Sequence, residues 1–361
     1  RRGTPGTEPA GAKGGETVAL TARIQKRYGS FLLDVDFSAG SGESLALLGA
    51  SGCGKSVTLR CLAGIDRPDW GHIELDGQVL YDGQRHINLP PQQRRVGYLF
   101  QQYALFPHMT VVENIAVCLR QLPRSQRRQR AAELISQLRL EGTERLRPHQ
   151  LSGGQQQRAA LARILASDPA AILLDEPLAA LDSCLKRQLE EELRDVLDAF
   201  GGPVIWVSHD RGEVYRSCRR VCVLDSGKSS QVTGFEELLT APGTVSAARI
   251  SGCEVFVPFL PGPEAGTISI PSWNLVLPAP WREGASILGV RPECVKPSAD
   301  GFPCQIVRIT EDISSVRLSL RPLNAPAEAP LLQMELSKPE WTTPPDQKTI
   351  HVSIPAEGLL L

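Results

Sequence analysis

The chain has 361 residues, with 39 Lys and Arg against 40 Asp and Glu and a formal net charge of −1 at pH 7. This balance gives no basic footprint for nucleic acid, and the length suits two domains that each bury a core. No apolar run approaches the roughly 18 residues of a membrane-spanning helix, and the first residues hold no signal-peptide core. We therefore expect no nucleic-acid partner and no membrane span in this chain.

Residues 1–16 are rich in Gly, Pro and Ala and lack large apolar side chains. Such a segment buries too little apolar surface to offset the conformational entropy lost on ordering. We expect a disordered tail over residues 1–16.

The nine cysteines show no paired C-x-x-C spacing of the kind that binds metals. Cys218 and Cys222 come nearest to a pair, but Cys222 lies in an apolar run typical of a buried strand. We expect reduced thiols, which favours a cytoplasmic protein.

Short apolar runs alternate with helix-length segments from Val18 to about Val232, as in residues 44–48, 171–174 and 204–207. Continuous apolar strands between helices are typical of a parallel sheet covered on both faces, which predicts an α/β fold. A helix-rich stretch over about 111–167 interrupts the strands and includes a helix predicted over 124–140.

The composition changes after about Pro242, because 16 of the 28 prolines fall in residues 255–361. Period-2 apolar alternation there predicts strands with one buried face, at residues 316–320, 332–336 and 350–354. Short strands between Pro-rich turns indicate a second domain, a small β-barrel over residues 243–361.

A phosphate-binding loop is predicted between an apolar strand and a helical run. It consists of Gly49, Ala50, Ser51, Gly52, Cys53, Gly54, Lys55 and Ser56. Its glycines let backbone N–H groups surround phosphates, and the next helix presents its N-terminus to them. We expect Lys55 to reach the β- and γ-phosphates of ATP and Ser56 to ligate Mg²⁺. For this motif alone, a Gly-rich turn without a ligand stays open.

An acidic pair, Asp175 and Glu176, follows the apolar strand at 171–174. Ligands of open α/β sheets bind where the strands end. Asp175 is therefore a candidate Mg²⁺ ligand, and Glu176 a candidate to orient or deprotonate the attacking water.

A second Gly-rich turn precedes that strand, formed by Leu151, Ser152, Gly153, Gly154 and Gln155. Ser152 is placed as the N-cap of a helix, so this is a second anion-binding helix end. The segment matches the signature of ABC ATPases, and the chain resembles that family over about residues 18–235. The resemblance implies a head-to-tail homodimer in which each signature closes on the γ-phosphate of ATP held by the other subunit.

Other motifs of the resemblance follow in order. Gln101 matches the Q-loop glutamine, implying contact with Mg²⁺ and the attacking water. Asp182 matches the D-loop, and His209 matches the switch histidine, expected on the γ-phosphate. Tyr28 is placed to stack on adenine. Alternatively, a lone Tyr or His is an ordinary packing residue.

Two positions depart from the family pattern. Val57, in the nucleotide-contacting segment, stands where Thr or Ser is usual, and Ala179 replaces the usual Ser ahead of the D-loop. Neither change removes Lys55, Glu176 or His209, so we expect ATP hydrolysis.

The resemblance further implies transport. Residues 103–111 look like the surface that receives a permease helix in importers, although their apolar groups are equally consistent with buried core. One short cassette also differs from repair-type members with long coiled coils and from translation-type members with two cassettes.

Residues 88–98 resemble the same stretch of molybdate-import ATPases, and residues 289–293 resemble a motif of the small TOBE/Mop-like barrel appended to importer ATPases. The resemblance implies an ATPase domain over 17–242 and a regulatory domain over 243–361. It also implies two permease subunits and an external binding protein, with this chain at the cytoplasmic face of the membrane. The expected cargo is molybdate or a related oxyanion. Sulfate, iron, polyamine or sugar, or a soluble anion-sensing ATPase without a permease, stay open.

Overall fold

The computed structural model describes residues 18–179, 183–279, 284–341, 348–355 and 358–360. The tail expected over residues 1–16 and Asp182 of the expected D-loop lie outside these ranges. The chain divides into two compact units, with the boundary between Val232 and Thr233.

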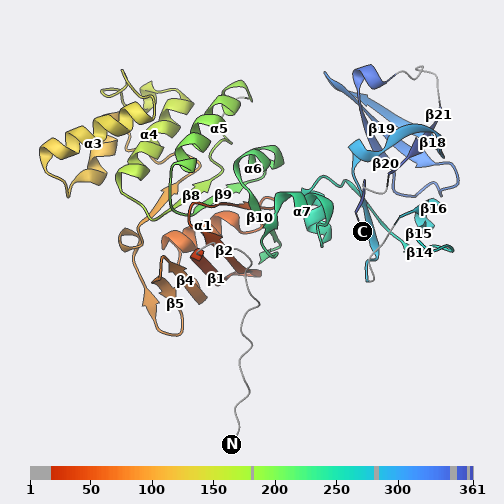
Figure 1. Ribbon diagram of the computed structural model, residues 1–361, viewed down its shortest axis with the longest axis horizontal. Helices are drawn as coiled ribbons and strands as arrows, with labels where there is room; N and C mark the ends of the chain where they lie inside the picture. The colour runs from red at the N-terminus through yellow and green to blue at the C-terminus, as the bar shows by residue number, and fades with distance from the viewer. Residues whose placement is uncertain (1–17, 180–182, 280–283, 342–347, 356–357, 361) are drawn as a thin grey trace, which may run out of the picture. The chain divides into compact units, whose positions relative to one another are not determined.

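The first unit contains one large sheet (Figure 1). Its strands are β1 (Val18–Tyr28), β2 (Phe31–Gly40), β3 (Ser44–Leu48), β4 (Trp70–Leu75), β5 (Gln78–Asp82), β6 (Ile87–Asn88), β7 (Val96–Leu99), β8 (Ala171–Asp175), β9 (Val204–Ser208), β10 (Arg220–Asp225) and β11 (Lys228–Ser229). They follow the order β6-β5-β4-β1-β2-β11-β10-β3-β9-β8-β7. The pairs β10–β3, β3–β9, β9–β8 and β8–β7 are parallel, whereas β1, β2, β4 and β5 pair antiparallel.

The parallel strands β3, β8 and β9 coincide with the apolar runs that the sequence predicted as strands. The patterns of β8 and β9 are buried throughout, as is most of β3, because helices cover both faces of this part of the sheet. The order β3-β9-β8 brings the carboxyl ends of three strands side by side, and the chain leaves each of them towards a functional motif.

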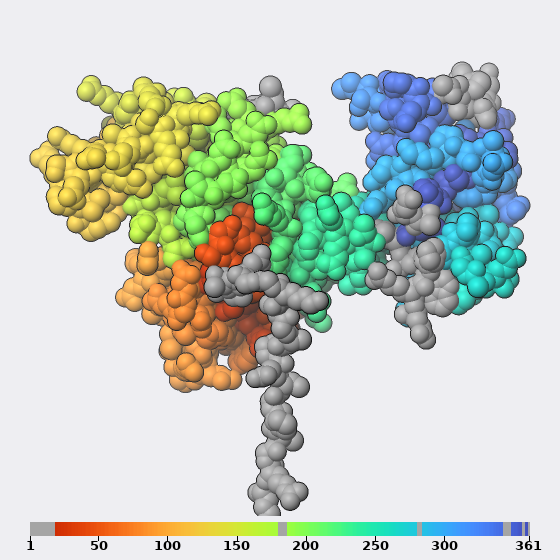
Figure 2. Space-filling model, viewed as in Figure 1, coloured from red at the N-terminus to blue at the C-terminus, as the bar shows by residue number. Residues whose placement is uncertain are grey.

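The helices of the first unit are α1 (Lys55–Ala63), α2 (Val111–Ala116), α3 (Arg124–Gln137), α4 (Gly153–Ala166), α5 (Ser183–Asp198) and α6 (Arg211–Ser217), with 3-10 turns η1 (Pro91–Gln93), η2 (Val117–Leu119) and η3 (Pro148–Gln150). The helix expected over 124–140 ends at Gln137, since Arg139 adopts a positive φ of 52°. In the space-filling view the helical segment, coloured yellow to light green, is continuous with the rest of this unit (Figure 2).

The second unit starts with β12 (Thr233–Gly234), α7 (Phe235–Thr240) and α8 (Val245–Ile250). The unit boundary therefore lies before the expected position at Pro242. The reason is a packed contact: Arg291 donates hydrogen bonds to the carbonyl of Leu239 in α7 and, at 3.1 Å, to that of Ser251 after α8. The two helices thus belong with the strands that follow.

Those strands are β13 (Val255–Pro258), β14 (Leu260–Pro261), β15 (Thr267–Ile270), β16 (Leu275–Pro278), β17 (Ile287–Val290), β18 (Lys296–Glu311), β19 (Ser315–Pro322), β20 (Leu332–Ser337), β21 (Thr349–Ser353) and β22 (Leu359–Leu360), with 3-10 turns η4 (Pro271–Trp273), η5 (Pro292–Cys294) and η6 (Lys338–Glu340). They form the sheets β13-β17-β22, β14-β15-β16 and β20-β19-β18-β21 around one core that includes the fully buried Trp273. The period-2 strands are confirmed: the apolar positions of β19, β20 and β21 are buried.

Most of the cysteines whose side chains the structure describes are buried. Burial raises the pKa of Cys61, Cys222 and Cys304 to about 12, so these thiols stay protonated at neutral pH. No helix within the described ranges is long and apolar enough to span a bilayer.

Candidate nucleotide site

The phosphate loop connects β3 to α1. Gly54 caps α1 with a φ of 109°, a left-handed conformation that few side chains adopt. A Cβ on Gly49 would lie 2.3 Å from the Leu224 carbonyl oxygen, so only glycine fits against β10. The loop backbone is therefore fixed by its two ends.

Lys55 is 6% exposed and turns back over this loop. Its Nζ donates hydrogen bonds to the carbonyl oxygens of Gly49, at 2.7 Å, and Ala50, at 2.9 Å. The ammonium group is thus held at the centre of the loop by two neutral acceptors, which phosphate oxygens can replace. Val57 packs against the hydrophobic core. The Val side chain therefore provides apolar contact at a position where the family usually has Thr or Ser.

Asp175, at the end of β8, receives two hydroxyl donors. Ser56 Oγ donates to Asp175 Oδ1 at 2.9 Å, and the Tyr98 hydroxyl donates to Oδ2 at 2.8 Å. Burial, followed by the charge of Asp175, raises the pKa of Tyr98, so the phenol stays a proton donor. Tyr98 reaches Asp175 because β7 lies beside β8 in parallel register.

Ser56 and Asp175 fit a Mg²⁺ site. Their oxygens already converge within hydrogen-bond distance, and both are hard ligands. Among the described residues no group of three His, Cys, Asp or Glu side chains is placed to hold a metal. Two protein oxygens suit Mg²⁺, which commonly keeps several waters and binds substrate phosphates.

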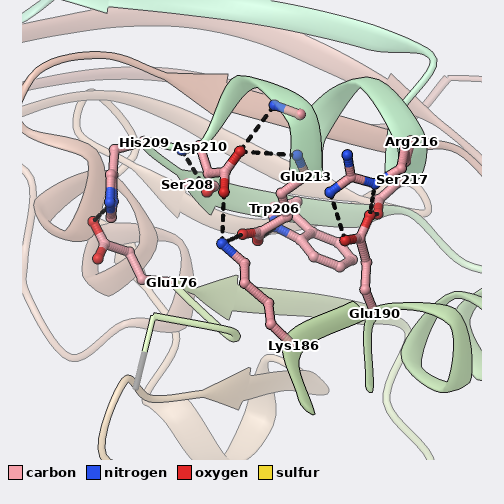
Figure 3. Close-up of polar contacts among 11 residues, drawn as sticks. Glu176, Lys186, Glu190, Trp206, Ser208, His209, Asp210, Glu213, Arg216 and Ser217 are labelled. Carbon is pink, nitrogen blue, oxygen red and sulfur yellow. Dashed lines mark hydrogen bonds and ion pairs between the residues drawn. The ribbon is translucent and has the colours of Figure 1, made fainter. Parts of the chain in front are cut away.

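Glu176 and His209 are in polar contact at the same sheet edge, with 3.3 Å between His209 Nδ1 and Glu176 Oε1 (Figure 3). Glu176 adopts a positive φ of 47°, and its backbone N–H donates to the Val207 carbonyl at 3.0 Å. Backbone strain of this kind costs energy and is common at functional sites. It turns the Glu176 side chain towards the residue that leaves β9.

A second cluster holds the segment after His209 (Figure 3). Lys186 Nζ, from α5, lies 2.6 Å from Asp210 Oδ2 and 3.4 Å from Glu213 Oε2. Asp210 Oδ1 caps α6 by accepting from the backbone N–H groups of Gly212 and Glu213. The residue next to His209 is therefore fixed both to α6 and to α5.

Glu213 is the buried member of this cluster. It accepts a 2.7 Å hydrogen bond from the indole of Trp206, which is fully buried in β9. Burial raises the pKa of Glu213, while Trp206 and Lys186 oppose that shift. The carboxyl thus joins the strand before His209 to the helix after it.

Tyr28 and Gln101, the other expected nucleotide contacts, are both exposed. Tyr28 is 43% exposed, and its hydroxyl donates to Asp66 at 2.8 Å. Asp66 also accepts from Arg60 of α1, so the Tyr28 ring is connected to the helix that follows the phosphate loop. Gln101 follows β7 closely, two residues after its end at Leu99.

The signature turn begins α4 as expected. Ser152 Oγ accepts from the Gln155 backbone N–H, and the Gln155 side chain accepts from the Ser152 N–H, forming a capping box. Ser152 and Gly153 are exposed, whereas Gly154 is buried against Leu189 of α5. This turn contacts residues of the helical segment and of α5. The phosphate loop, Asp175, Glu176 and His209 form a separate group at the carboxyl ends of β3, β8 and β9.

Arg94 is a structural residue that sequence reasoning missed. It is completely buried, and its guanidinium donates to the carbonyls of Cys61 and Leu62 at the end of α1 and to the Leu89 carbonyl. Arg94 lies within residues 88–98, the stretch that resembles molybdate-import ATPases. The structural role of this part of the stretch is to anchor α1. Tyr98 and Lys186 were also missed, because their partners are distant in sequence.

Comparisons with known proteins identify the family. Residues 32–179 match the family described as ABC transporter. The chain is 39% identical to the putrescine transport ATP-binding protein of Escherichia coli (strain K12) over 282 residues, 74% of this chain and 73% of that protein. It is 39% identical to a sulfate/thiosulfate import ATP-binding protein of Caulobacter vibrioides over 303 residues, 81% of this chain and 86% of that protein.

A molybdenum import ATP-binding protein of Paramagnetospirillum magneticum is 40% identical over 224 residues, 62% of this chain and 61% of that protein. Among solved structures, a dimeric ATP-binding cassette bound to ADP and Pi matches with a TM-score of 0.51 and 29% identity, over 60% of this chain and 98% of that one. This chain therefore belongs to the ATP-hydrolysing subunits of ABC transporters, among the import ATP-binding proteins.

Proposed function

We propose that this chain binds and hydrolyses Mg²⁺-ATP at the edge formed by β3, β8 and β9. One observation carries the proposal: Ser56, Asp175, Glu176 and His209 come from three sequence motifs and meet at this edge through contacts of 2.9 Å and 3.3 Å. Such a cluster, directly beside a phosphate loop, suits phosphoryl transfer to water.

The roles follow from the contacts. Lys55 exchanges its loop carbonyls for the β- and γ-phosphate oxygens, Gln101 contacts the water and the metal site, and Tyr28 stacks on adenine. Ser56 and Asp175 hold Mg²⁺, which when bound neutralises phosphate charge. Glu176 orients the attacking water and accepts its proton, while His209 stays on Glu176 and the γ-phosphate.

The active form is a head-to-tail homodimer. The signature turn exposes Ser152 and Gly153 at the N-terminus of α4, a helix end that favours an anion. Within the described part of one chain, this turn contacts the helical segment and not the phosphate loop. The anion that it binds is therefore the γ-phosphate of ATP held by the partner subunit. A similar solved cassette is dimeric, in support of this arrangement.

Residues 103–111 are proposed to receive the permease. Tyr103 is buried, whereas Phe106 is 40% exposed. Asn114 and Arg163 fix this segment through its backbone: Asn114 accepts from the Phe106 N–H at 2.8 Å, and Arg163 donates to the Ala104 carbonyl at 2.6 Å. A cavity of about 390 Å³ beside it is lined in part by His108 and Met109. A fixed, partly apolar surface suits a helix of a membrane subunit.

The second unit is proposed to be a TOBE/Mop-like regulatory domain. Support comes from its small sheets around one core and from the motif at 289–293, in which Arg291 ties the helices to the strands. The cassette would act at the cytoplasmic face of a membrane with two permease subunits and an external binding protein.

The proposed cargo is an oxyanion of the molybdate kind, supported by the resemblance of residues 88–98 and 289–293. The sulfate/thiosulfate relative matches over most of both chains, which favours an oxyanion. A polyamine is the second candidate, because a spermidine/putrescine relative of Acidothermus cellulolyticus also matches over 82% of this chain at 37% identity.

Uptake by ATP-loaded right-side-out vesicles that contain this chain, its cognate permease and the external binding protein tests the cargo. We expect ATP-dependent accumulation of radiolabelled molybdate that unlabelled tungstate competes away. Accumulation of labelled putrescine without molybdate uptake would reject the oxyanion proposal. A Lys55→Ala chain, which lacks the phosphate-binding ammonium, is the control for ATP dependence.

A further inference from the structure

Lys186, near the start of α5, is a charged side chain that the proposed mechanism does not use. Its Nζ lies 2.6 Å from Asp210 Oδ2 and 3.4 Å from Glu213 Oε2, so one ammonium group faces two carboxylates (Figure 3). Asp210 directly follows His209, the expected switch histidine. The contact therefore joins α5 to the segment that presents His209.

The charges in this contact stabilise one another. Burial would lower the pKa of Lys186, but the hydrogen bond to Asp210 and the charges of Glu213 and Asp210 outweigh burial and raise it. Burial would raise the pKa of Asp210, but the hydrogen bond from Lys186 and those from two backbone N–H groups lower it. Without Lys186, the two carboxylates would repel each other, and the start of α6 would lose a fixed position.

The orientation of His209 depends on its backbone, because its side chain is 61% exposed. The residues on either side of it are tied together, since the Asp210 N–H donates to Ser208 Oγ at 3.0 Å. Asp210 Oδ1 accepts from two backbone N–H groups at the start of α6, at 2.9 Å and 3.1 Å, and Oδ2 accepts from Lys186. Both carboxylate oxygens of Asp210 thus hold the turn that carries His209.

A second ion pair joins the same two helices farther from His209. Arg216 donates to Glu190 at 2.7 Å from Nε and at 2.8 Å from Nη2, a bidentate pair (Figure 3). Glu190 lies four residues after Lys186, on the same face of α5. In one pair the cation is on α5, and in the other it is on α6. Sliding one helix along the other would bring like charges together, so the two pairs fix the register of α5 and α6.

We propose that Lys186 is a positioning residue for ATP hydrolysis, which holds Asp210 and thereby keeps His209 within reach of Glu176 and of the γ-phosphate. The inference rests on the proposed function, since it needs His209 to act on ATP. The 3.3 Å contact between His209 and Glu176 is already long for a hydrogen bond, so a displacement of about 1 Å breaks it. Misplacement of this size costs on the order of 100-fold in rate. Lys186 acts through Asp210 and not on the nucleotide itself.

Steady-state ATPase kinetics of the full chain with Lys186→Met test the proposal, because Met keeps the length of the side chain and removes the ammonium. We expect kcat to fall by about tenfold or more while KM for ATP changes by less than about twofold, since the phosphate loop is unaltered. Lys186→Arg keeps the charge and should retain at least about half of the wild-type kcat. Asp210→Asn keeps a good cap for α6 but loses the charge that attracts Lys186, and should lower kcat by a similar factor.

Glu190→Gln is the matched control. It removes the charge of the other ion pair between the same helices, so we expect a lower melting temperature with kcat within about twofold of wild type. The rise in melting temperature with Mg²⁺-ATP shows that each variant folds and binds nucleotide. Wild-type kcat in Lys186→Met or Asp210→Asn overturns the proposal.

Two further outcomes also overturn the proposal. One is a loss of kcat in Glu190→Gln equal to that in Lys186→Met, which would mean that stability alone governs the rate. The other is a Lys186→Arg chain as slow as Lys186→Met. The wild-type chain is measured in the same assay: absence of hydrolysis there rejects the proposed function itself, whereas wild-type hydrolysis that Lys186→Met leaves unchanged rejects only the role of Lys186.

Discussion

At the residue scale, the carboxylate of Asp175 depends on donors from two directions. Ser56 comes from the phosphate loop and Tyr98 from the neighbouring strand, so the carboxyl plane is fixed before any ligand arrives. Groups held in this way lose little freedom on binding, which is the physical basis of a preorganised site.

Replacing Tyr98 by Phe removes one of these donors. We expect Tyr98→Phe to lower the free energy of unfolding by about 1 to 2 kcal/mol, because a buried carboxylate oxygen loses its partner. The Mg²⁺ concentration for half-maximal ATPase activity should also rise. Tyr81→Phe is the matched control, since it loses a buried 2.8 Å bond to the Pro68 carbonyl, away from Asp175. Unchanged Mg²⁺ dependence in Tyr98→Phe would contradict this role.

Glu213 predicts a pH dependence of stability. Its pKa is raised above the ordinary 4.5 by burial, so the folded state prefers the protonated carboxyl. Its contribution to stability is full below pH 4.5 and is lost as pH rises through the raised value. Relative to Glu213→Gln, the wild-type protein should therefore lose stability as pH rises from about 4 to about 8.

Glu113 provides a control of opposite sign for this measurement. Hydrogen bonds from Thr110 lower the pKa of this exposed carboxyl, so its contribution is present above the ordinary value and lost on acidification. Melting temperatures of both Gln variants from about pH 3 to about pH 8 check the two signs, because the Glu113 contribution changes only below the ordinary value of 4.5. A stability difference for Glu213→Gln that does not vary with pH would refute the effect of burial.

At the scale of the elements, α1 depends on residues far along the chain. The carbonyls of Cys61 and Leu62 at its C-terminus are buried and receive the Arg94 guanidinium. Carbonyls at a helix end need such partners when water is excluded. The residues after β6 therefore help to keep the phosphate-loop helix formed.

Replacing Arg94 by Met removes these donors at similar length. We expect Arg94→Met to destabilise the first unit by about 3 kcal/mol and to weaken ATP binding, since several buried carbonyls lose their partners. Arg95→Met is the neighbouring control: Arg95 forms an exposed 3.4 Å pair with Asp168, and its loss should change stability by less than about 0.5 kcal/mol. Chemical denaturation of both variants gives the comparison. Equal stability of the two would disprove the anchoring role.

Local patterns predicted much of this architecture and part of the site. Buried strands such as β8 and β9 are visible as apolar runs, and the phosphate loop and signature are contiguous in sequence. Tyr98 and Lys186 were not predictable, because their hydrogen bonds to Asp175 and Asp210 arise only when β7 and α5 pack beside those residues. Residues 88–98, which include Arg94, were notable in the sequence only for their resemblance to a family. The burial of Arg94 against α1 depends on the tertiary structure, so the sequence did not predict it.

At the scale of the whole molecule, the two units have separate hydrophobic cores. One core joins β1–β5, β8–β10 and α1, and the other consists only of residues from Val255 onwards. Each is large enough to support its own cooperative transition. The boundary at Val232 rather than Pro242 assigns α7 and α8 to the second of them.

Calorimetry of the full chain is therefore expected to show two unfolding transitions. Mg²⁺-ATP should raise the midpoint of only one, because the proposed nucleotide contacts lie in the first unit and ligands stabilise the state that binds them. The nonhydrolysing Glu176→Gln chain keeps the ligand intact during heating. A single transition, or an equal shift of both, would contradict independent cores.

The central claim is that Glu176 activates water in an ATP-bound homodimer. It is tested most directly by comparing wild-type protein with Glu176→Gln for steady-state ATPase activity and for mass in solution with Mg²⁺-ATP. We predict that the variant binds ATP and becomes dimeric while its turnover falls about 100-fold or more, since the amide cannot accept the proton. ATPase activity near the wild-type rate in Glu176→Gln would contradict the account.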